Sequence, residues 1–282
     1  MIQIEQIKNY FPAQFRENSS FDKHMLKEYL QLMILDYLSS TPNIQKMVFI
    51  GGTNLRLVKG IDRFSEDLDF DCKDLSKDEF IEMTNGVIQF LERSGLRVEA
   101  KDKESPKLTA FRRNIHFPEL LFDLGLSGYK EERFLIKVES QDQGIVYSPV
   151  ITNIKGCGFF FPFPVPSDGV LCSMKIAAML ARAKGRDFYD LMFLLAQTKP
   201  DYDFLSKRCG VHNLHEFKQA TSELLKTVDL KKKQKDFEHL LFNKVNSEKI
   251  LRFEEFVDSL TAGQQKTMIK SHSPTPNMTI LS

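Results

Sequence analysis

The sequence lacks an excess of charge of either sign, and it lacks long apolar runs. Its 282 residues include 39 Lys and Arg against 38 Asp and Glu, a net charge of +1. A protein that binds nucleic acid through bulk electrostatics is usually much more basic, so any such contact must come from a local patch. No stretch approaches the roughly 18 apolar residues of a membrane span, and the N-terminus has no apolar segment typical of a signal peptide. We expect a soluble, cytoplasmic protein.

Cysteine is also scarce, and the motifs of several common enzyme classes are missing. The four cysteines form no C-x-x-C pair and have no histidine at metal-binding spacing, which excludes a disulfide scaffold and a Cys/His metal site. The chain has no H-E-x-x-H set, no G-x-S-x-G nucleophile motif and no Walker loop. We expect the cysteines to be small buried residues in a reducing compartment. They are Cys72, Cys157, Cys172 and Cys209.

Strand and helix patterns are mixed in the first half of the chain, whereas the second half is helical. A proline-dense segment separates the halves; it is too rich in proline for a central strand and predicts a crossover. These patterns predict an α+β fold, with a mixed-sheet domain over 1–165, an all-helical domain over 166–262 and a flexible tail over 263–282. The periodicities predict strands at 46–50, 67–72, 96–100, 108–117 and 133–139, helices at 22–38, 53–58, 76–93, 170–184, 187–197, 215–227, 234–242 and 248–260, and the crossover at 151–168.

Two glycines and a hydroxyl residue follow the first predicted strand. Gly51, Gly52 and Thr53 stand between the run KMVFI and a predicted helix. Glycine lets the backbone approach a ligand closely, and the N–H groups at a helix start favour an anion such as phosphate. A Gly-Gly turn is by itself usually only a turn, so this signal needs a second feature to support it.

Asp67 and Asp69 supply that second feature. They lie two residues apart on a predicted strand, so both carboxylates point to one face while Leu68 and Phe70 anchor the other. Two like charges this close are unfavourable unless a cation lies between them. Magnesium is the natural choice, because it binds carboxylates and nucleotide phosphate oxygens together. An isolated pair of this kind is more often a solvent-facing strand edge, but the upstream Gly-Gly-Thr favours a metal-nucleotide site.

These residues resemble a known family in two blocks that occur in the same order. Gly51-Gly52-Thr53 followed by Arg63-Phe-Ser65-Glu-Asp67-Leu-Asp69-Phe resembles the GGT…RxSxDhDh signature of the AbiEii/AbiGii nucleotidyltransferase toxins, of the DNA polymerase β-like superfamily. Lys175 to Arg182 and Arg186-Asp-Phe-Tyr-Asp190-Leu resemble the family's K…R…RDxxDL motif. The resemblance implies a polymerase-β-like nucleotidyltransferase domain over 1–165. It also implies nucleotide contacts from Gly51, Gly52, Thr53, Arg56, Arg63, Ser65, Arg182 and Arg186.

The second block also has a physical interpretation of its own. On one continuous helix, Lys175, Arg182 and Arg186 would lie within about 20° of a common stripe, with Asp190 at its border about 60° away. The stripe interrupts helices that are otherwise apolar, which makes simple solvent exposure less plausible. A lysine that reaches triphosphate oxygens would offset the charge that builds up during transfer. Gly185 could break the helix and with it this geometry.

The third acid of the site is ambiguous. Sites of the polymerase-β type commonly use three carboxylates, the third on a strand beside the pair. Glu139 ends a plausible partner strand and is the first candidate. Asp190 competes with it through the helical motif, and Asp123 is a weaker option.

The resemblance implies a magnesium-dependent enzyme that moves a nucleotide from an NTP to an acceptor hydroxyl. In this hypothesis Asp67 and Asp69 hold the metal, Lys175 contacts the triphosphate, and Glu139 or Asp190 activates the acceptor. The family implies the toxin of a type IV toxin–antitoxin or phage-defence pair, with a separately encoded antitoxin and tRNA as the leading acceptor. The alternatives are transfer to a small hydroxylated molecule, as in aminoglycoside nucleotidyltransferases, and a non-catalytic nucleotide-binding module.

Overall fold

The computed structural model describes residues 2–101 and 110–261. A five-stranded mixed sheet forms its centre, in the order β1 (Met47–Ile50), β2 (Leu68–Cys72), β5 (Leu135–Gln141), β4 (Phe111–His116) and β3 (Glu99–Ala100). Only the central pair β2·β5 is parallel, and the other neighbours are antiparallel. The predicted α+β class with a mixed sheet is confirmed. The predicted tail, 263–282, lies outside the described residues.

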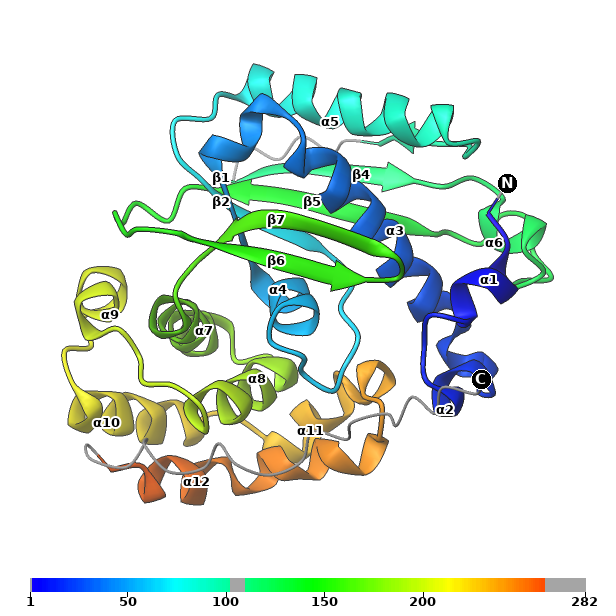
Figure 1. The fold of residues 1–282 in the computed structure, drawn as a ribbon. Helices are drawn as coiled ribbons and strands as arrows, with labels where there is room; N and C mark the ends of the chain where they lie inside the picture. Colours follow the sequence, from blue (N-terminus) through cyan, green and yellow to red (C-terminus); the bar gives the residue numbers. More distant parts are fainter. Residues whose placement is uncertain (1, 102–109, 262–282) are drawn as a thin grey trace, which may run out of the picture.

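Two long helices of the first half pack with the sheet (Figure 1). Helix α3 (Asp22–Ser39) and helix α5 (Lys77–Arg93) match the predicted helices closely. Ser76 and Glu79 form a reciprocal capping box that fixes where α5 begins. The other helices of this half are short: α1 (Ile4–Lys8), α2 (Ala13–Arg16), α4 (Gly51–Leu57) and α6 (Leu120–Asp123), with 3-10 turns at Ser19–Phe21 and Pro42–Lys46.

The proline-dense segment forms a hairpin of two strands, which the prediction of a crossover did not include, although neither strand belongs to the central sheet. Strands β6 (Val150–Gly156) and β7 (Phe159–Val165) pair antiparallel. Pro162 and Pro164 are two residues apart on β7, so both ring nitrogens face away from β6 and no ladder bond is lost. Between them, Phe163 is fully buried and packs against Phe49 and Phe70 of the central sheet.

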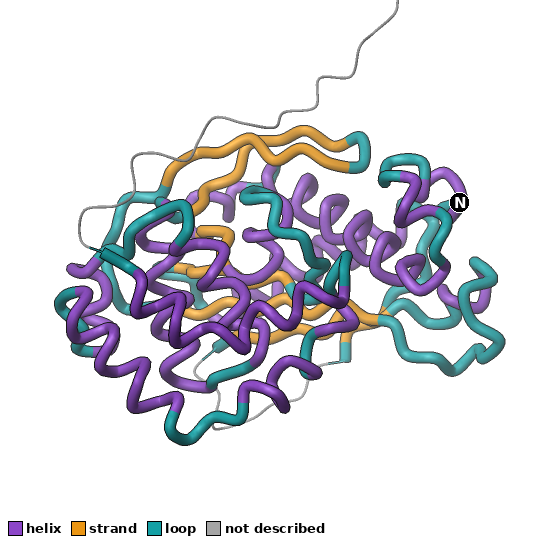
Figure 2. The backbone as a smooth tube through the Cα atoms, turned by 90° about the horizontal axis from the view of Figure 1, so that it is seen from below, coloured by secondary structure: helices purple, strands orange, loops and turns teal. Residues whose placement is uncertain are grey.

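The second half is helical and has a core of its own. Figure 1 places its helices below the sheet, and Figure 2 views the molecule from that side, with the helices in front of the strands. Leu55 and Ile61 from the first half are buried in this core, so the halves share an interface. The helices are α7 (Asp168–Arg182), α8 (Gly185–Leu195), α9 (Tyr202–Cys209), α10 (Leu214–Leu225), α11 (Leu230–Lys235) and α12 (Phe253–Ser259), with 3-10 turns at Glu238–Leu240 and Lys244–Arg252.

The helices differ from prediction mainly after residue 195. Helix α9 was not predicted, the predicted helix 234–242 lies instead at 230–235, and the first part of the predicted helix 248–260 is a 3-10 turn. Strand β7 ends at Val165 and α7 begins at Asp168, close to the expected domain boundary. The division into domains itself stays a prediction. None of the helices in the described part of the chain is both long and apolar enough to cross a membrane.

Candidate active site

The Gly-Gly turn brings the end of β1 against the first residues of β2. Gly51 has φ of +84°, a left-handed conformation, and a Cβ at this position would lie 2.2 Å from Oδ2 of Asp69. Both features require glycine. A Cβ on Gly52 would meet Oγ of Ser65 at 2.8 Å and a guanidinium nitrogen of Arg63 at 2.9 Å. The two parts of the first sequence block are therefore packed directly on each other.

Asp67, Asp69 and Glu139 form a cluster of three acidic residues. Glu139 lies opposite Asp69 in the parallel register of β2 and β5, so both side chains point to one face of the sheet. Burial, together with the charges of Asp67 and Glu139, raises the pKa of Asp69 to about 6. This crowding of like charge is what a bound cation would relieve.

Lys137 supplies positive charge to this cluster. Its Nζ lies 2.8 Å from Oδ2 of Asp67 and 3.3 Å from Oε1 of Glu139, and Arg112 also pairs with Glu139. Although burial lowers it, the pKa of Lys137 is raised overall because of these two carboxylates, so the ammonium stays charged. Within residues 2–101 and 110–261, no three Asp, Glu, His or Cys side chains form a preformed metal-ligand cluster. The donor set nevertheless suits a hard cation, which carboxylates prefer.

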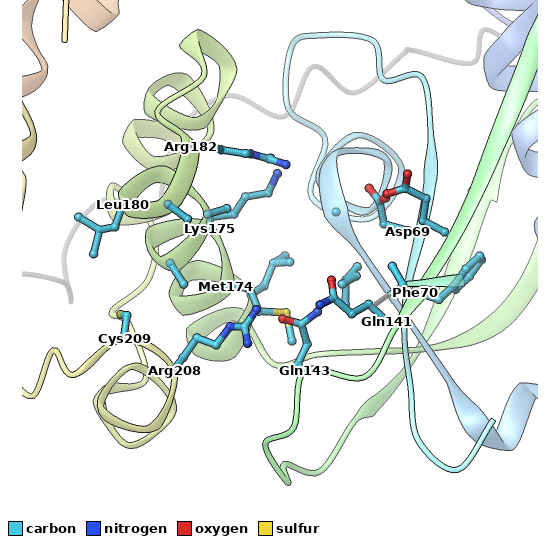
Figure 3. Close-up of a pocket in the computed structure, with 18 residues that line it drawn as sticks. Asp69, Phe70, Gln141, Gln143, Met174, Lys175, Leu180, Arg182, Arg208 and Cys209 are labelled. Carbon is cyan, nitrogen blue, oxygen red and sulfur yellow. The ribbon is translucent and has the colours of Figure 1, made fainter. Parts of the chain in front are cut away.

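A cavity of about 650 Å³ lies beside the acids, between the sheet and the C-terminal helices (Figure 3). Gly51, Asp69 and Glu139 line one wall, and Lys175 and Arg182 of α7 line the opposite wall. In Figure 3 the two cationic side chains point from α7 towards Asp69. One side of the cavity therefore has carboxylates that can bind a divalent cation, and the other has cationic side chains that can bind phosphate oxygens.

Lys175 is held in place by a buried ion network. Its Nζ donates to Oδ2 of Asp190 at 2.8 Å, and Arg63 binds both carboxylate oxygens of Asp190 at 2.7 and 2.8 Å. Arg63 and Asp190 are both fully buried. Burial alone would raise the pKa of Asp190, but Arg63 and Lys175 lower it, so the carboxylate is charged. The network joins the two sequence blocks, since Arg63 comes from the first and Lys175 with Asp190 from the second.

A comparison with protein families decides which family the chain is in. The profile described as "Nucleotidyl transferase AbiEii toxin, Type IV TA system" matches residues 34–266. The chain belongs to the AbiEii family. It is therefore a nucleotidyltransferase of a toxin family, a class that generally uses a divalent metal with an NTP.

Solved structures support the fold of this AbiEii protein. The nucleotidyltransferase toxin MenT4 from Mycobacterium tuberculosis H37Rv is 16% identical, with a TM-score of 0.56 over 93% of this chain and 91% of MenT4. JHP933 from Helicobacter pylori is 20% identical, with a TM-score of 0.50 over 83% of this chain and 90% of JHP933. No curated protein sequence matches the chain.

Several residues that the family resemblance assigned to the nucleotide lie away from the cavity. Arg56 binds Glu28 through two hydrogen bonds of 2.7 and 3.0 Å and lies over the ring of Phe242. The Thr53 hydroxyl donates to the backbone oxygen of Asp67 and is buried. Thr53 therefore fixes the backbone that carries the acids. Gly52, Arg63 and Ser65 are packed behind Gly51 and do not line the cavity either.

Lys175, Arg182 and Arg186 do not share one continuous helix, so the common stripe considered for that case is absent. Ala183 is left-handed, with φ of 46°, and separates α7 from α8. A Cβ at Gly185 would lie 1.9 Å from the backbone oxygen of Lys233, so α8 can begin here only with glycine. Arg182 lines the cavity and pairs with the buried Asp187 at 2.8 Å, whereas Arg186 is not among the lining residues.

Of the three candidates for the third acid, only Glu139 lies with the aspartates. Asp190 is fully buried among Arg63 and Lys175, and Asp123 pairs with Arg97 on the surface. Sequence reasoning missed Lys137, which lies two residues before Glu139 and so on the same strand face. It also missed Gln143 and Arg208, which line the cavity from segments with no motif.

We predict that Asp190→Asn destabilises the fold strongly, whereas Glu139→Gln does not. Removing one partner of a buried ion network leaves the other charges uncompensated, at a cost of about 3–5 kcal/mol. Glu139 is half-buried, and Lys137 keeps Asp67 as a partner when Glu139 is neutralised, so the change should cost less than about 1 kcal/mol. Urea unfolding measures both. A fully stable Asp190→Asn variant without activity would instead place Asp190 among the reacting groups.

Proposed function

We propose that this protein transfers a nucleotidyl group from an NTP to a hydroxyl of tRNA, and that it is the toxin of a type IV toxin–antitoxin pair with a separately encoded antitoxin. The observation that carries the proposal is the placement of Asp69 and Glu139 across the cavity from Lys175 and Arg182. Asp67 does not line the cavity, but its charge acts on Asp69. Carboxylates that can hold a cation and cationic side chains that can bind phosphate then face one cavity.

In this proposal each residue has a distinct task. Asp67 and Asp69 would hold Mg²⁺, which when bound neutralises phosphate charge and makes the α-phosphorus more electrophilic. Lys175, held by Asp190, donates to the triphosphate and offsets the charge that develops on the departing pyrophosphate. Arg182 lies about two turns further along the same face of α7 and contacts the same phosphates. Gly51 has no side chain, so the backbone can approach the phosphates closely.

Glu139 is the proposed proton acceptor. Its carboxylate lies beside Asp69 at the cavity wall, where an acceptor hydroxyl must approach the α-phosphorus. It would take the proton as the new O–P bond forms and the bond to the leaving pyrophosphate breaks. Asp190 cannot take this role in the arrangement observed, because Arg63 and Lys175 occupy its oxygens.

The acceptor class can be tested by salt dependence. A tRNA must be held through phosphate contacts, and the net charge of +1 means that these are local. Each contact releases counterions, so we predict that the affinity for tRNA, measured at saturating NTP, falls about tenfold or more between 50 and 200 mM salt. A small hydroxylated acceptor would show a nearly flat profile.

Arg186 provides the matched variant for that experiment. It lies in the first turn of α8, near Arg182 and Lys184 in sequence, but does not line the nucleotide cavity. Arg186→Ala should lower the slope of log affinity against log salt by about 1, while Lys231→Ala on α11 should leave it unchanged. An affinity of the unmodified protein that does not change with salt would show that the acceptor is a small molecule and not tRNA. Transfer of a labelled nucleotide to small molecules and not to RNA would show the same.

A further inference from the structure

The two ends of the cavity differ in chemistry. Asp69, Lys175 and Arg182 gather at one end. At the other end, Figure 3 shows Gln143, Arg208 and Met174 pointing towards one another. The second end combines an apolar wall, to which Leu171 of α7 also contributes, with an amide and a guanidinium group.

This division fits the two parts of a nucleotide. The triphosphate needs cations and a metal, which only the first end provides. A nucleobase needs an apolar surface for its face and hydrogen-bonding groups for its edge. The amide of Gln143 can both donate and accept, and the guanidinium of Arg208 donates from several N–H groups. The second end therefore has the chemistry of a base pocket.

Asp71 builds this end of the cavity. It follows Asp67 and Asp69 at the same period on β2 but is fully buried. One of its oxygens accepts from the backbone N–H of Gln143 at 2.9 Å, and the other accepts from the hydroxyl of Tyr147 at 2.5 Å. The third aspartate of the strand thus fixes the loop that carries Gln143.

The same contacts connect this loop to the opposite wall. The ring of Tyr147 packs edge-on against Phe204 of α9, with centroids 6.0 Å apart. Helix α9 also carries Arg208. The chain of contacts from Asp71 through Tyr147 to Phe204 therefore sets how far Gln143 and Arg208 lie from each other.

We propose that Gln143 and Arg208 select the nucleobase of the NTP, and that Asp71 is a positioning residue that holds Gln143 in place. This inference rests on the proposed nucleotidyl transfer. The NTP lies with its phosphates at Lys175 and Arg182 and its base between Met174 and the Gln143 loop. The base edge is read by the amide and the guanidinium group. The same end of the cavity is then closed to the acceptor.

The test compares all four NTPs in two assays, equilibrium binding in the presence of Mg²⁺ and transfer kinetics. The unmodified protein should prefer one NTP at least tenfold over the worst. Gln143→Ala and Arg208→Ala should each reduce that preference about tenfold or more, because a site that hydrogen-bonds the correct base rejects bases that leave its groups unpaired. Gln219→Ala, on the exposed face of α10, is the matched control and should keep the preference.

Tyr147→Phe tests the positioning role without removing a charge. Loss of its hydroxyl removes one of the two hydrogen bonds by which Asp71 holds the loop, so the preference among NTPs should fall while kcat for the best NTP changes less than threefold. A merely structural role would lower kcat or stability and leave the preference intact. Any of three results for Gln143→Ala and Arg208→Ala would overturn the proposal. The variants could keep the NTP preference of the unmodified protein, or they could lose activity equally with all four NTPs. The third such result is a change confined to the KM of the acceptor. Absence of NTP binding by the unmodified protein would instead overturn the proposed function.

Discussion

Asp69→Asn is expected to abolish nucleotidyl transfer, with a loss of at least about 10³-fold, and to make the metal-free protein more stable. The catalytic loss follows because Asp69 lies at the centre of the three acids that would hold the cation. The stabilisation follows because the charge of Asp69 is unfavourable where it stands. Burial and the charges of Asp67 and Glu139 raise its pKa to about 6.

The size of the stabilisation by Asp69→Asn depends on pH. The unfolded Asp loses its proton near pH 4, whereas folded Asp69 keeps it until about pH 6. Between these values the folded state binds more protons, so the free energy of unfolding falls as the pH rises. Asparagine does not ionise, so Asp69→Asn abolishes this fall in the free energy of unfolding. Its stability should equal that of the unmodified protein at pH 4 and exceed it by roughly 2–3 kcal/mol at pH 7.5 without metal.

Urea unfolding at the two pH values, without metal and with excess Mg²⁺, measures this difference. Mg²⁺ should stabilise the unmodified protein at pH 7.5 and should have little effect on Asp69→Asn. Asp258→Asn, on the exposed part of α12, is the control and should change neither activity nor stability. An Asp69→Asn variant that transfers nucleotide at the normal rate, or that is less stable at pH 7.5, would contradict the assignment.

Lys175→Met is expected to reduce kcat/KM for the NTP by about 10²–10³-fold, because removal of one preorganised donor to a developing anion costs that much. Methionine keeps most of the buried stem, and Arg63 still binds both oxygens of Asp190, so the fold should survive. Lys231→Met on the exposed α11 is the matched control. Steady-state kinetics at fixed acceptor gives both values. Equal losses at the two lysines would show that the lysines of α11, Lys231–Lys233 and Lys235, carry substrate.

The sequence predicted that Asp67 and Asp69 lie close together, for a local reason. A two-residue period on one short strand places Asp67 and Asp69 on one face whatever the rest of the chain does. To predict the position of Glu139, one must also know that its strand pairs with β2. That pairing is parallel and joins residues 70 positions apart. No local pattern specifies it, so Glu139 and Asp190 could not be separated before the structure was known.

The features that the sequence did not predict depend on contacts between segments far apart in the chain. The chain breaks between α7 and α8 at the left-handed Ala183, and the start of α8 at Gly185 packs on the backbone oxygen of the distant Lys233. The β6–β7 hairpin tolerates its prolines because both face the edge away from the partner strand. Asp71 resembles its two neighbours in sequence, yet its partners, Gln143 and Tyr147, lie on a loop more than 70 residues away. Motif spacing identifies the acids but does not show which of them are already occupied by other groups.

The most direct test of the central claim follows two labels on the same NTP through the reaction. The unmodified protein is incubated with Mg²⁺, total RNA and an NTP labelled at either the α- or the γ-phosphate. Nucleotidyl transfer predicts that the α-label enters the acceptor, that the γ-label appears only in pyrophosphate in equal amount, and that Asp69→Asn and Lys175→Met lose both signals. Entry of the γ-label into the acceptor, or α-label transfer that survives in Asp69→Asn, would contradict the account.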